Sequence, residues 1–451
     1  MIGPATTPAP PSPTPTVPAP SPAPAEAARQ AAAGLGLPQV FRAILATSGA
    51  KVYTLAAGIV SLALTARWLG PEGRGQVAAV ATWAAMVFSF GYLSLGQVAL
   101  HRAASEPGEG WVAEVAGNLA FAAVVVTVLG WSVVAVAYAV TGGTLFGGLP
   151  VPVMVLGFLA LPFLVWEQYG SSLLMALGAL PTYNKAVVVG RTLGLAILVI
   201  TVPLLGWGVK GALVAAALTQ ATVALGGVRR ILRASGRALT VDLRGLRGLV
   251  TGGAKLHLNA IGSFLFMNAD ILMLQYYRGA TETGYYQLAV QLGTILLMPA
   301  QAASMVLFSR VAESGPDGAW AVSRRVLAWM TGLMVAGAAL AALLAPWAIP
   351  LVAGRAFTPS VLPFQVLLLS VIGMTFSTVM APQWIGRGLF WQVSGLTLFA
   401  GLLNVGINVW AIPRWGMLGA TWATVLSYAV ALAANLGLAL RIERKGAWRA
   451  A

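Results

Sequence analysis

The sequence predicts an all-α protein that crosses a membrane many times, with about twelve helices in two similar lobes around a central cavity. Three observations support this prediction. The chain has 451 residues, of which 58% are hydrophobic and only 9% are charged, and its mean hydropathy is +0.83. Its apolar residues form blocks of helical length, and its two halves repeat. A soluble domain carries nearer a quarter of charged residues, so the composition excludes that class.

The apolar blocks are about twenty residues long or more, which is enough to cross a bilayer as a helix. Examples are residues 119–140, 187–205, 326–345 and 396–412. The strands of a porin-type barrel alternate apolar and polar residues over short segments, so these continuous blocks exclude a barrel.

Twelve segments are predicted to be membrane helices, joined mostly by very short connections, so that neighbours form antiparallel hairpins. They cover approximately residues 45–69, 76–101, 112–140, 151–179, 184–206, 209–232, 250–276, 284–309, 322–346, 361–386, 389–412 and 416–440.

An internal repeat divides the chain. The motif Trp-Gly-x-x-Gly-Ala at 207–212 recurs at 415–420, which is 208 positions later. Gly75 and Gly284 are 209 positions apart and follow the first helix of each half. Two copies of one membrane bundle are typical of transporters, in which the binding cavity lies between the halves.

The predicted organisation has five parts. A Pro/Ala-rich tail covers 1–40, and its composition favours disorder. The two six-helix lobes cover 41–233 and 250–441, with a basic linker at 234–249 between them and a basic tail at 442–451. The beginning of the chain lacks the basic and apolar regions of a signal peptide, so the first hydrophobic helix is expected to direct insertion.

Basic residues predict the orientation in the membrane. They concentrate in the loop between the sixth and seventh helices and in the C-terminal tail, and short cytoplasmic loops are rich in Lys and Arg. Both termini are therefore expected to be cytoplasmic, in a multi-pass membrane protein. The net charge of +15 would also suit nucleic acid. Because the charges alternate between loops as topology signals do, we expect membrane lipid and no nucleic acid as partner.

Enzymatic chemistry is not expected. The chain has no cysteine and only two histidines, which rules out thiolate catalysis and zinc-thiolate sites. It shows no nucleophile elbow and no cluster of metal ligands. The glycine-rich stretch 70–75 lies in an external turn between two membrane helices, where its role is expected to be structural.

Polar faces on the first two helices of each half predict a hydrophilic cavity, because a polar residue facing lipid is costly. At 100° per residue, Lys255, Asn259, Ser263 and Asp270 lie on one face of the seventh helix. Ordinary hydrogen bonds between helices are the alternative explanation. The predicted cavity residues are Lys51, Gln76, Gln97, Lys255, Asn259, Ser263, Asp270, Gln287, Gln291 and Gln301.

Charged residues suggest more specific roles. Asp270 and Glu167 are the acids well inside predicted helices, and each is a candidate for coupling to H⁺ or Na⁺; a salt bridge is the alternative. Arg191, Arg310 and Arg387 lie near the inner ends of helices. They are candidate phosphate contacts, because guanidinium offers paired donors to phosphate oxygens, or else they anchor the helix ends at the interface.

Several motifs resemble one known family. Residues 66–75, Ala-Arg-Trp-Leu-Gly-Pro-Glu-Gly-Arg-Gly, look like the first external loop of Wzx-type polysaccharide exporters. Asn-Ala-Asp at 268–270, followed by Gly-Tyr-Tyr-Gln-Leu-Ala at 284–289, is similar to their seventh and eighth helices. Asn404 and Asn408 precede a stretch that is similar to their eleventh and twelfth. The resemblance covers about residues 42–440.

The resemblance implies a MATE-like fold and membership of the multidrug/oligosaccharidyl-lipid/polysaccharide exporter superfamily. The implied activity is to flip a polyprenyl-diphosphate-linked oligosaccharide from the cytoplasmic to the outer leaflet, for the synthesis of cell-surface polysaccharide. Alternating access coupled to an ion gradient would drive it. Other membrane proteins of polysaccharide assembly are the expected protein partners, and no cofactor is expected beyond the coupling ion.

Three other functions remain open from the sequence. A cation or drug antiporter of the same superfamily would favour acids and aromatic residues in the cavity. A lipid II flippase typically has fourteen spans. A membrane-bound polysaccharide polymerase or ligase needs a sizeable external loop, whereas all the external loops predicted here are short.

Overall fold

The computed structural model describes residues 37–105 and 110–450 of the chain. Most of the predicted tail at 1–40 lies outside this part, and so do the side chains of 37–48, 50–52, 102–105, 255–256 and 444–450. The chain divides into two compact units, Met1–Leu45 and Ala46–Ala451, and the features below belong to the second unit.

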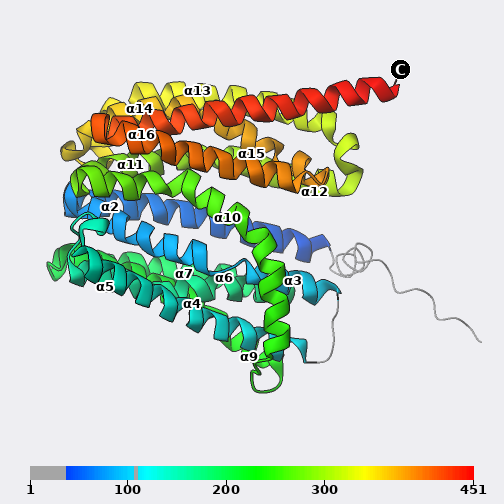
Figure 1. Cartoon of the computed structure of the whole chain (residues 1–451), viewed down its shortest axis with the longest axis horizontal. Coiled ribbons are helices and arrows are strands. Elements are labelled where there is room, and N and C mark those ends of the chain that lie inside the picture. Colours follow the sequence, from blue (N-terminus) through cyan, green and yellow to red (C-terminus); the bar gives the residue numbers. More distant parts are fainter. Residues whose placement is uncertain (1–36, 106–109, 451) are drawn as a thin grey trace, which may run out of the picture. The chain divides into compact units, whose positions relative to one another are not determined.

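The described residues form helices and no strand, which confirms the all-α prediction. The first half contains α2 (Leu37–Gly91), α3 (Leu95–Ser105), α4 (Trp111–Thr141), η1 (Thr144–Phe146), α5 (Val151–Phe158), α6 (Leu161–Ala176), α7 (Leu180–Val199), η2 (Ile200–Leu204), α8 (Gly208–Gly226) and α9 (Val228–Ser235). The second half contains α10 (Leu243–Arg278), α11 (Ala280–Leu296), α12 (Met298–Gly318), α13 (Trp320–Ala353), η3 (Arg355–Ser360), α14 (Val361–Leu367), η4 (Leu368–Ser370), α15 (Val371–Gly386) and α16 (Phe390–Ala450). Figure 1 shows their order.

Twelve helical segments correspond to the twelve predicted spans. Among the described residues, eight helices are long and apolar enough to cross a membrane, and two bent helix pairs raise this number to ten. Two of these ten candidates contain a further break, α2 at Gly70 and α16 at Gly416, and each break divides its helix in two. With these breaks counted, the described helices divide into twelve segments, one for each predicted span.

The two halves repeat in three dimensions as well as in sequence. Gly70 has φ 64° and ψ −177°, and Gly279, 209 positions later, has φ 81° and ψ −175°. This backbone conformation is accessible almost only to glycine. In each half, the same reversal thus joins the first helical segment to the second. We call the end of the bundle that holds these turns the Gly70 end, and the end at which α9 stops the Gly236 end.

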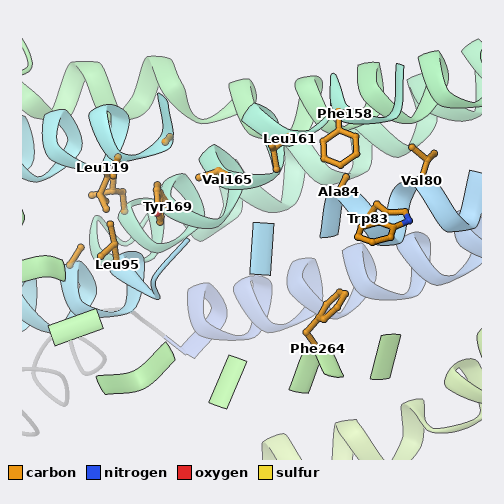
Figure 2. Close-up of a cluster of buried hydrophobic side chains, with 14 of the residues drawn as sticks. Val80, Trp83, Ala84, Leu95, Leu119, Phe158, Leu161, Val165, Tyr169 and Phe264 are labelled. Atoms are coloured by element: carbon orange, nitrogen blue, oxygen red, sulfur yellow. The ribbon is translucent and has the colours of Figure 1, made fainter. Parts of the chain in front are cut away.

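Each half contributes its first helix to the core of the other. The buried core of the second half includes Leu62 and Ala66 from the first segment of α2. The core of the first half includes Phe264 and Leu272 from α10. Figure 2 draws part of the latter cluster, with Trp83 and Tyr169 from the first half and Phe264 from α10. The halves are therefore two lobes, and the first helical segment of each lobe packs into the core of the other.

Large apolar side chains cover much of the outer surface. Val133, Val136 and Val140 on α4 are 64%, 62% and 80% exposed, and Leu343 and Trp347 on α13 are 63% and 66% exposed. Apolar patches of this extent are unusual on soluble proteins. They suit a surface in contact with lipid, where helices already satisfy their own backbone hydrogen bonds.

Candidate functional site

A polar cavity of about 350 Å³ lies between α2, α7, α8 and α11. Its walls come mostly from small residues, which leave space between the helices. We call it the arginine cavity, because two arginines line it. The polar side chains around it are Ser61, Thr65, Arg74, Arg191, Thr219, Gln220, Gln287 and Gln291.

Arg74 connects the two lobes at one end of this cavity. It lies four residues after the break at Gly70, inside the second segment of α2, and it is only 5% exposed. Its Nη2 atom donates to Gln287 Oε1 at 2.8 Å and to Gln291 Oε1 at 2.6 Å, both on α11 of the other lobe. Its Nη1 atom donates to Thr65 Oγ1 at 2.7 Å. The guanidinium is therefore held by hydrogen bonds from both sides of the lobe interface.

The positive charge of Arg74 has no acidic partner among the described residues. Each of its hydrogen-bond acceptors is a hydroxyl, an amide or a backbone carbonyl. Its Nε atom is buried without a hydrogen-bond partner. Of the residues that line the cavity, none is Asp or Glu, and Arg191 adds a second cation. Burying a charge without a counter-ion is costly, so the cavity is suited to receive an anion.

A contact between two glycines closes the Gly70 end beside this arginine. A Cβ atom on Gly75 would lie 1.7 Å from the carbonyl oxygen of Ala280, and one on Gly284 would lie 1.9 Å from that of Pro71. Ala280 follows Pro71 by 209 positions, as Gly284 follows Gly75. The repeat-related residues thus meet each other across the lobe interface, and only glycine permits so close an approach.

Arg191 and Gln220 also line the arginine cavity, and Gln220 contacts Glu167. The Gln220 amide donates a hydrogen bond to one carboxylate oxygen of Glu167, and the Tyr183 hydroxyl donates to the other at 2.9 Å. Glu167 itself lines a small separate cavity rather than the arginine cavity. Its carboxylate therefore reaches the arginine cavity only through Gln220.

Asp270 is buried in the second lobe and lines none of the described cavities. It is 3% exposed and accepts hydrogen bonds from the Tyr286 hydroxyl and, at 2.8 Å, from the Ile271 backbone N–H. The Tyr286 hydroxyl also lies 3.2 Å from Thr424 Oγ1. Within the described residues Asp270 forms no ion pair, so the salt bridge considered from the sequence is not present there.

A second polar cavity, also of about 350 Å³, brings together three of the predicted residues. Gln97, Asn259 and Ser263 line it, and so do the rings of Phe88 and Tyr92. It lies between α3, α6, α10 and the C-terminal end of α2. We call it the amide cavity, because four of its lining residues are Asn or Gln: Gln97, Gln168, Asn259 and Asn268.

The other predicted residues lie elsewhere. Gln76 lines an open groove with Lys210. Gln301 is exposed on α12. Arg310 is exposed and lies 3.5 Å from Glu313, and Arg387 bonds to Asp317 at 2.6 Å. The side chains of two further predicted residues, Lys51 and Lys255, lie outside the described residues.

Arg74 is the residue that the sequence analysis missed. The glycine-rich stretch 70–75 was interpreted as a structural turn, which Gly70 indeed makes. The chain is already helical again after this glycine, and Arg74 points into the interface rather than to solvent. Counting four residues from Gly70, which is repeated as Gly279, would have put Arg74 on the first turn of a cavity-lining helix.

Comparisons with known proteins agree with this architecture. A family model described as "Polysaccharide biosynthesis protein" matches residues 40–313. No curated protein matches the chain. An inward-facing structure of a multidrug resistance MATE family transporter of the MOP superfamily has a TM-score of 0.68 and 16% identity, over 86% of this chain and 95% of that one.

Two further structures extend the comparison. Lipid II flippase MurJ in an inward closed conformation has a TM-score of 0.71 and 13% identity, over 88% of this chain and 87% of that one. An outward-facing MATE family transporter has a TM-score of 0.54 and 18% identity, over 88% and 96%. At these identities the likeness concerns the fold alone, and it confirms the MATE-like prediction.

Proposed function

Because the chain belongs to the polysaccharide biosynthesis protein family and has the fold of membrane transporters, we propose that it flips a polyprenyl-diphosphate-linked oligosaccharide across the membrane. The direction is from the cytoplasmic to the outer leaflet of a bacterial cytoplasmic membrane. The Gly236 end, near the basic linker, is then cytoplasmic. The observation that carries the proposal is the presence of a cationic cavity and a neutral, amide-lined cavity along one helix.

The arginine cavity suits the diphosphate. Arg74 and Arg191 line it, and no acid among the described residues does. Guanidinium groups bind phosphate oxygens with paired, charge-assisted hydrogen bonds, which are stronger than those to neutral groups. A cavity of this volume lies at the lower end of the range for ligand sites, about 300 to 1,000 Å³. It would hold a diphosphate with little else.

The amide cavity suits uncharged sugars. Amide and hydroxyl side chains can donate and accept hydrogen bonds with sugar hydroxyls, and the rings of Phe88 and Tyr92 offer apolar faces. The second segment of α2 lines both cavities, the first at Ala81 and the second at Phe88. Seven residues of helix span roughly 10 Å, so one headgroup can reach both. The polyprenyl tail remains in lipid.

Asp270 is the proposed site of coupling to an H⁺ or Na⁺ gradient. It is a buried carboxylate without a cationic partner among the described residues, and burial of an unpaired charge is unfavourable. Binding a proton or a cation there removes that cost. Because Asp270 lies on α10, which packs along α16 within the second lobe, a change in its charge acts on the packing of that lobe.

An antiporter for cationic drugs is less well supported. Such a protein would present acids to its substrate, and neither Asp270 nor Glu167 lines the arginine cavity. The cations that do line it would repel a cationic substrate.

Flipping of a fluorescent polyprenyl-diphosphate oligosaccharide in proteoliposomes tests the proposal, with and without a pH or sodium gradient. We expect flipping that depends on the protein and falls at least about tenfold in Arg191→Ala, since the lost contact is a charge-assisted one. Arg414→Ala is the control, because Arg414 is an exposed arginine whose hydrogen bond, to the Trp410 carbonyl, lies within its own helix. Uptake of a cationic dye without any lipid flipping would instead support the antiporter.

A further inference from the structure

The position of Arg74 raises a question about how the Gly70 end opens. This residue lines the arginine cavity, and the same guanidinium holds the two lobes together through Gln287 and Gln291. For the lobes to separate at that end, both hydrogen bonds must break. Any ligand of Arg74 in the cavity therefore competes with the closed state of the lobes.

The competition favours an anion. The two glutamine oxygens are neutral acceptors, and they occupy the Nη2 atom completely. A phosphate oxygen is charged, so it adds a direct Coulomb attraction to the guanidinium that the glutamine oxygens lack, and two phosphate oxygens can accept paired hydrogen bonds from it. The Nε atom of Arg74, buried and without a partner, is a further donor for the phosphate.

The repeat shows that this arrangement is one-sided. The position related to Arg74 in the second lobe is Thr283, 209 residues later, and the positions related to Gln287 and Gln291 are Ala78 and Thr82. The contact between Gly75 and Gly284 is thus symmetric, whereas the hydrogen bonds beside it are not. The first lobe supplies one cation, and the second lobe supplies two amides.

We propose that Arg74 is a latch released by the substrate: a diphosphate in the arginine cavity takes Arg74 from Gln287 and Gln291, and the Gly70 end opens. The proposal rests on the proposed function and adds the step that links headgroup binding to opening. A ligand shifts a conformational equilibrium only by its differential affinity for the two states. In the closed state, two of the five guanidinium donors of Arg74 bond to the glutamines, so they are not free for a diphosphate. The affinity for diphosphate is therefore lower in the closed state than in the open state.

Spin labels can measure the opening directly, because the chain contains no cysteine of its own. Lys210→Cys and Arg414→Cys put one label on each lobe, at exposed positions beside the helix breaks of the Gly70 end. The full-length protein in nanodiscs is titrated with inorganic pyrophosphate, which carries the charge of the headgroup without its lipid or sugar. Calorimetry measures the affinity for pyrophosphate in parallel.

Three variants distinguish the latch from simpler roles. In the labelled protein without further substitutions, pyrophosphate is expected to lengthen the distance between the two labels. The double variant Gln287→Leu with Gln291→Leu is expected to be open without ligand and to bind pyrophosphate at least roughly tenfold more tightly, the factor of one hydrogen bond to a charged group. Arg74→Lys is expected to lose most of the response, because ammonium lacks the paired donors. Gln392→Leu, at an exposed position of the opposite end, is the control and is expected to change neither measurement.

Two results would overturn the latch. Weaker binding of pyrophosphate by the double glutamine variant would mean that these glutamines are ligands rather than competitors. An unchanged distance at saturating pyrophosphate would mean that binding and opening are not linked. If lipid-linked saccharide is flipped while either result holds, the latch fails and the proposed function stands. If pyrophosphate opens the Gly70 end but no lipid-linked saccharide is flipped, the latch stands and the proposed function fails.

Discussion

The contact between Gly75 and Gly284 predicts that a single methyl group changes the balance between conformations. In Gly284→Ala the new Cβ would lie 1.9 Å from the Pro71 carbonyl oxygen, whereas real Cβ atoms essentially never approach other atoms closer than 3.0 Å. The two segments must therefore separate by at least 1.1 Å, the difference between these two values. Both partners of the contact are backbone, so no side chain can rotate away to relieve it.

The magnitude follows from the cost of overpacking. Added groups in a packed interior cost about 1 to 3 kcal/mol. The substitution penalises only the state in which the Gly70 end is closed, so the ratio of closed to open protein should fall about 5- to 150-fold. The matched control is Gly293→Ala on the same helix, α11, where a Cβ would meet nothing within 4 Å. Both substitutions replace a helical glycine by alanine, so their effects on helix propensity cancel in the comparison.

Spin-label distances between Lys210→Cys and Arg414→Cys measure the result. We expect the long-distance population to rise in Gly284→Ala and to stay unchanged in Gly293→Ala, with equal yields of folded protein. Identical distance distributions in the two variants would refute the reasoning, because the Gly75 and Gly284 contact would then not define the closed state. A similar loss of folded protein in both would instead point to a general effect of alanine on α11.

Three further predictions concern single side chains. Asp270→Asn should abolish the dependence of flipping on the ion gradient, because asparagine has no charge for a proton or cation to neutralise, while its single oxygen can still accept the Tyr286 hydroxyl; a gradient dependence that survives in flipping assays would exclude this coupling role. Glu282→Ala should lower the stability by about 1 kcal/mol, since Glu282 accepts the Met417 N–H at 2.9 Å and so caps the helix after Gly416. Glu282→Gln should retain most of that stability in the same thermal melt. Trp384→Phe should cost about 1 to 3 kcal/mol, because it leaves the buried Asn435 Oδ1 atom without the indole donor, now at 2.9 Å; a melt unchanged from that of the parent protein would contradict this.

The arrangement of the helices could be predicted well from the sequence, since bilayer thickness dictates the length of each apolar segment. The repeat could also be predicted, because Gly75 and Gly284 serve the same contact and are both required to be glycine. The breaks within the segments could not be predicted in the same way. The breaks at 92–94 and at Leu297 divide two predicted spans. Gly91 directly precedes the first break and Pro299 follows the second, but glycine and proline also occur where a helix continues, as Pro382 does in α15.

The candidate site was predictable only in part. Helical periodicity put Asn259 and Ser263 on one face, and both line the amide cavity. The same reasoning grouped Asp270 with them, yet its carboxylate turns into the second lobe, toward Tyr286. A periodicity gives the direction of a side chain from its helix axis, but it does not say which neighbouring helix covers that direction.

The sequence by itself determined the environment, the number of segments and the twofold repeat, because these depend on local hydrophobicity and on spacing along the chain. Only the tertiary structure decided which polar residues meet. Arg74 lies beside Gln287 and Gln291, more than 210 positions away, because α2 of the first lobe packs against α11 of the second. Each of these contacts depends on how helices pack sideways, and that packing is set by small residues and glycine contacts distributed over the whole chain.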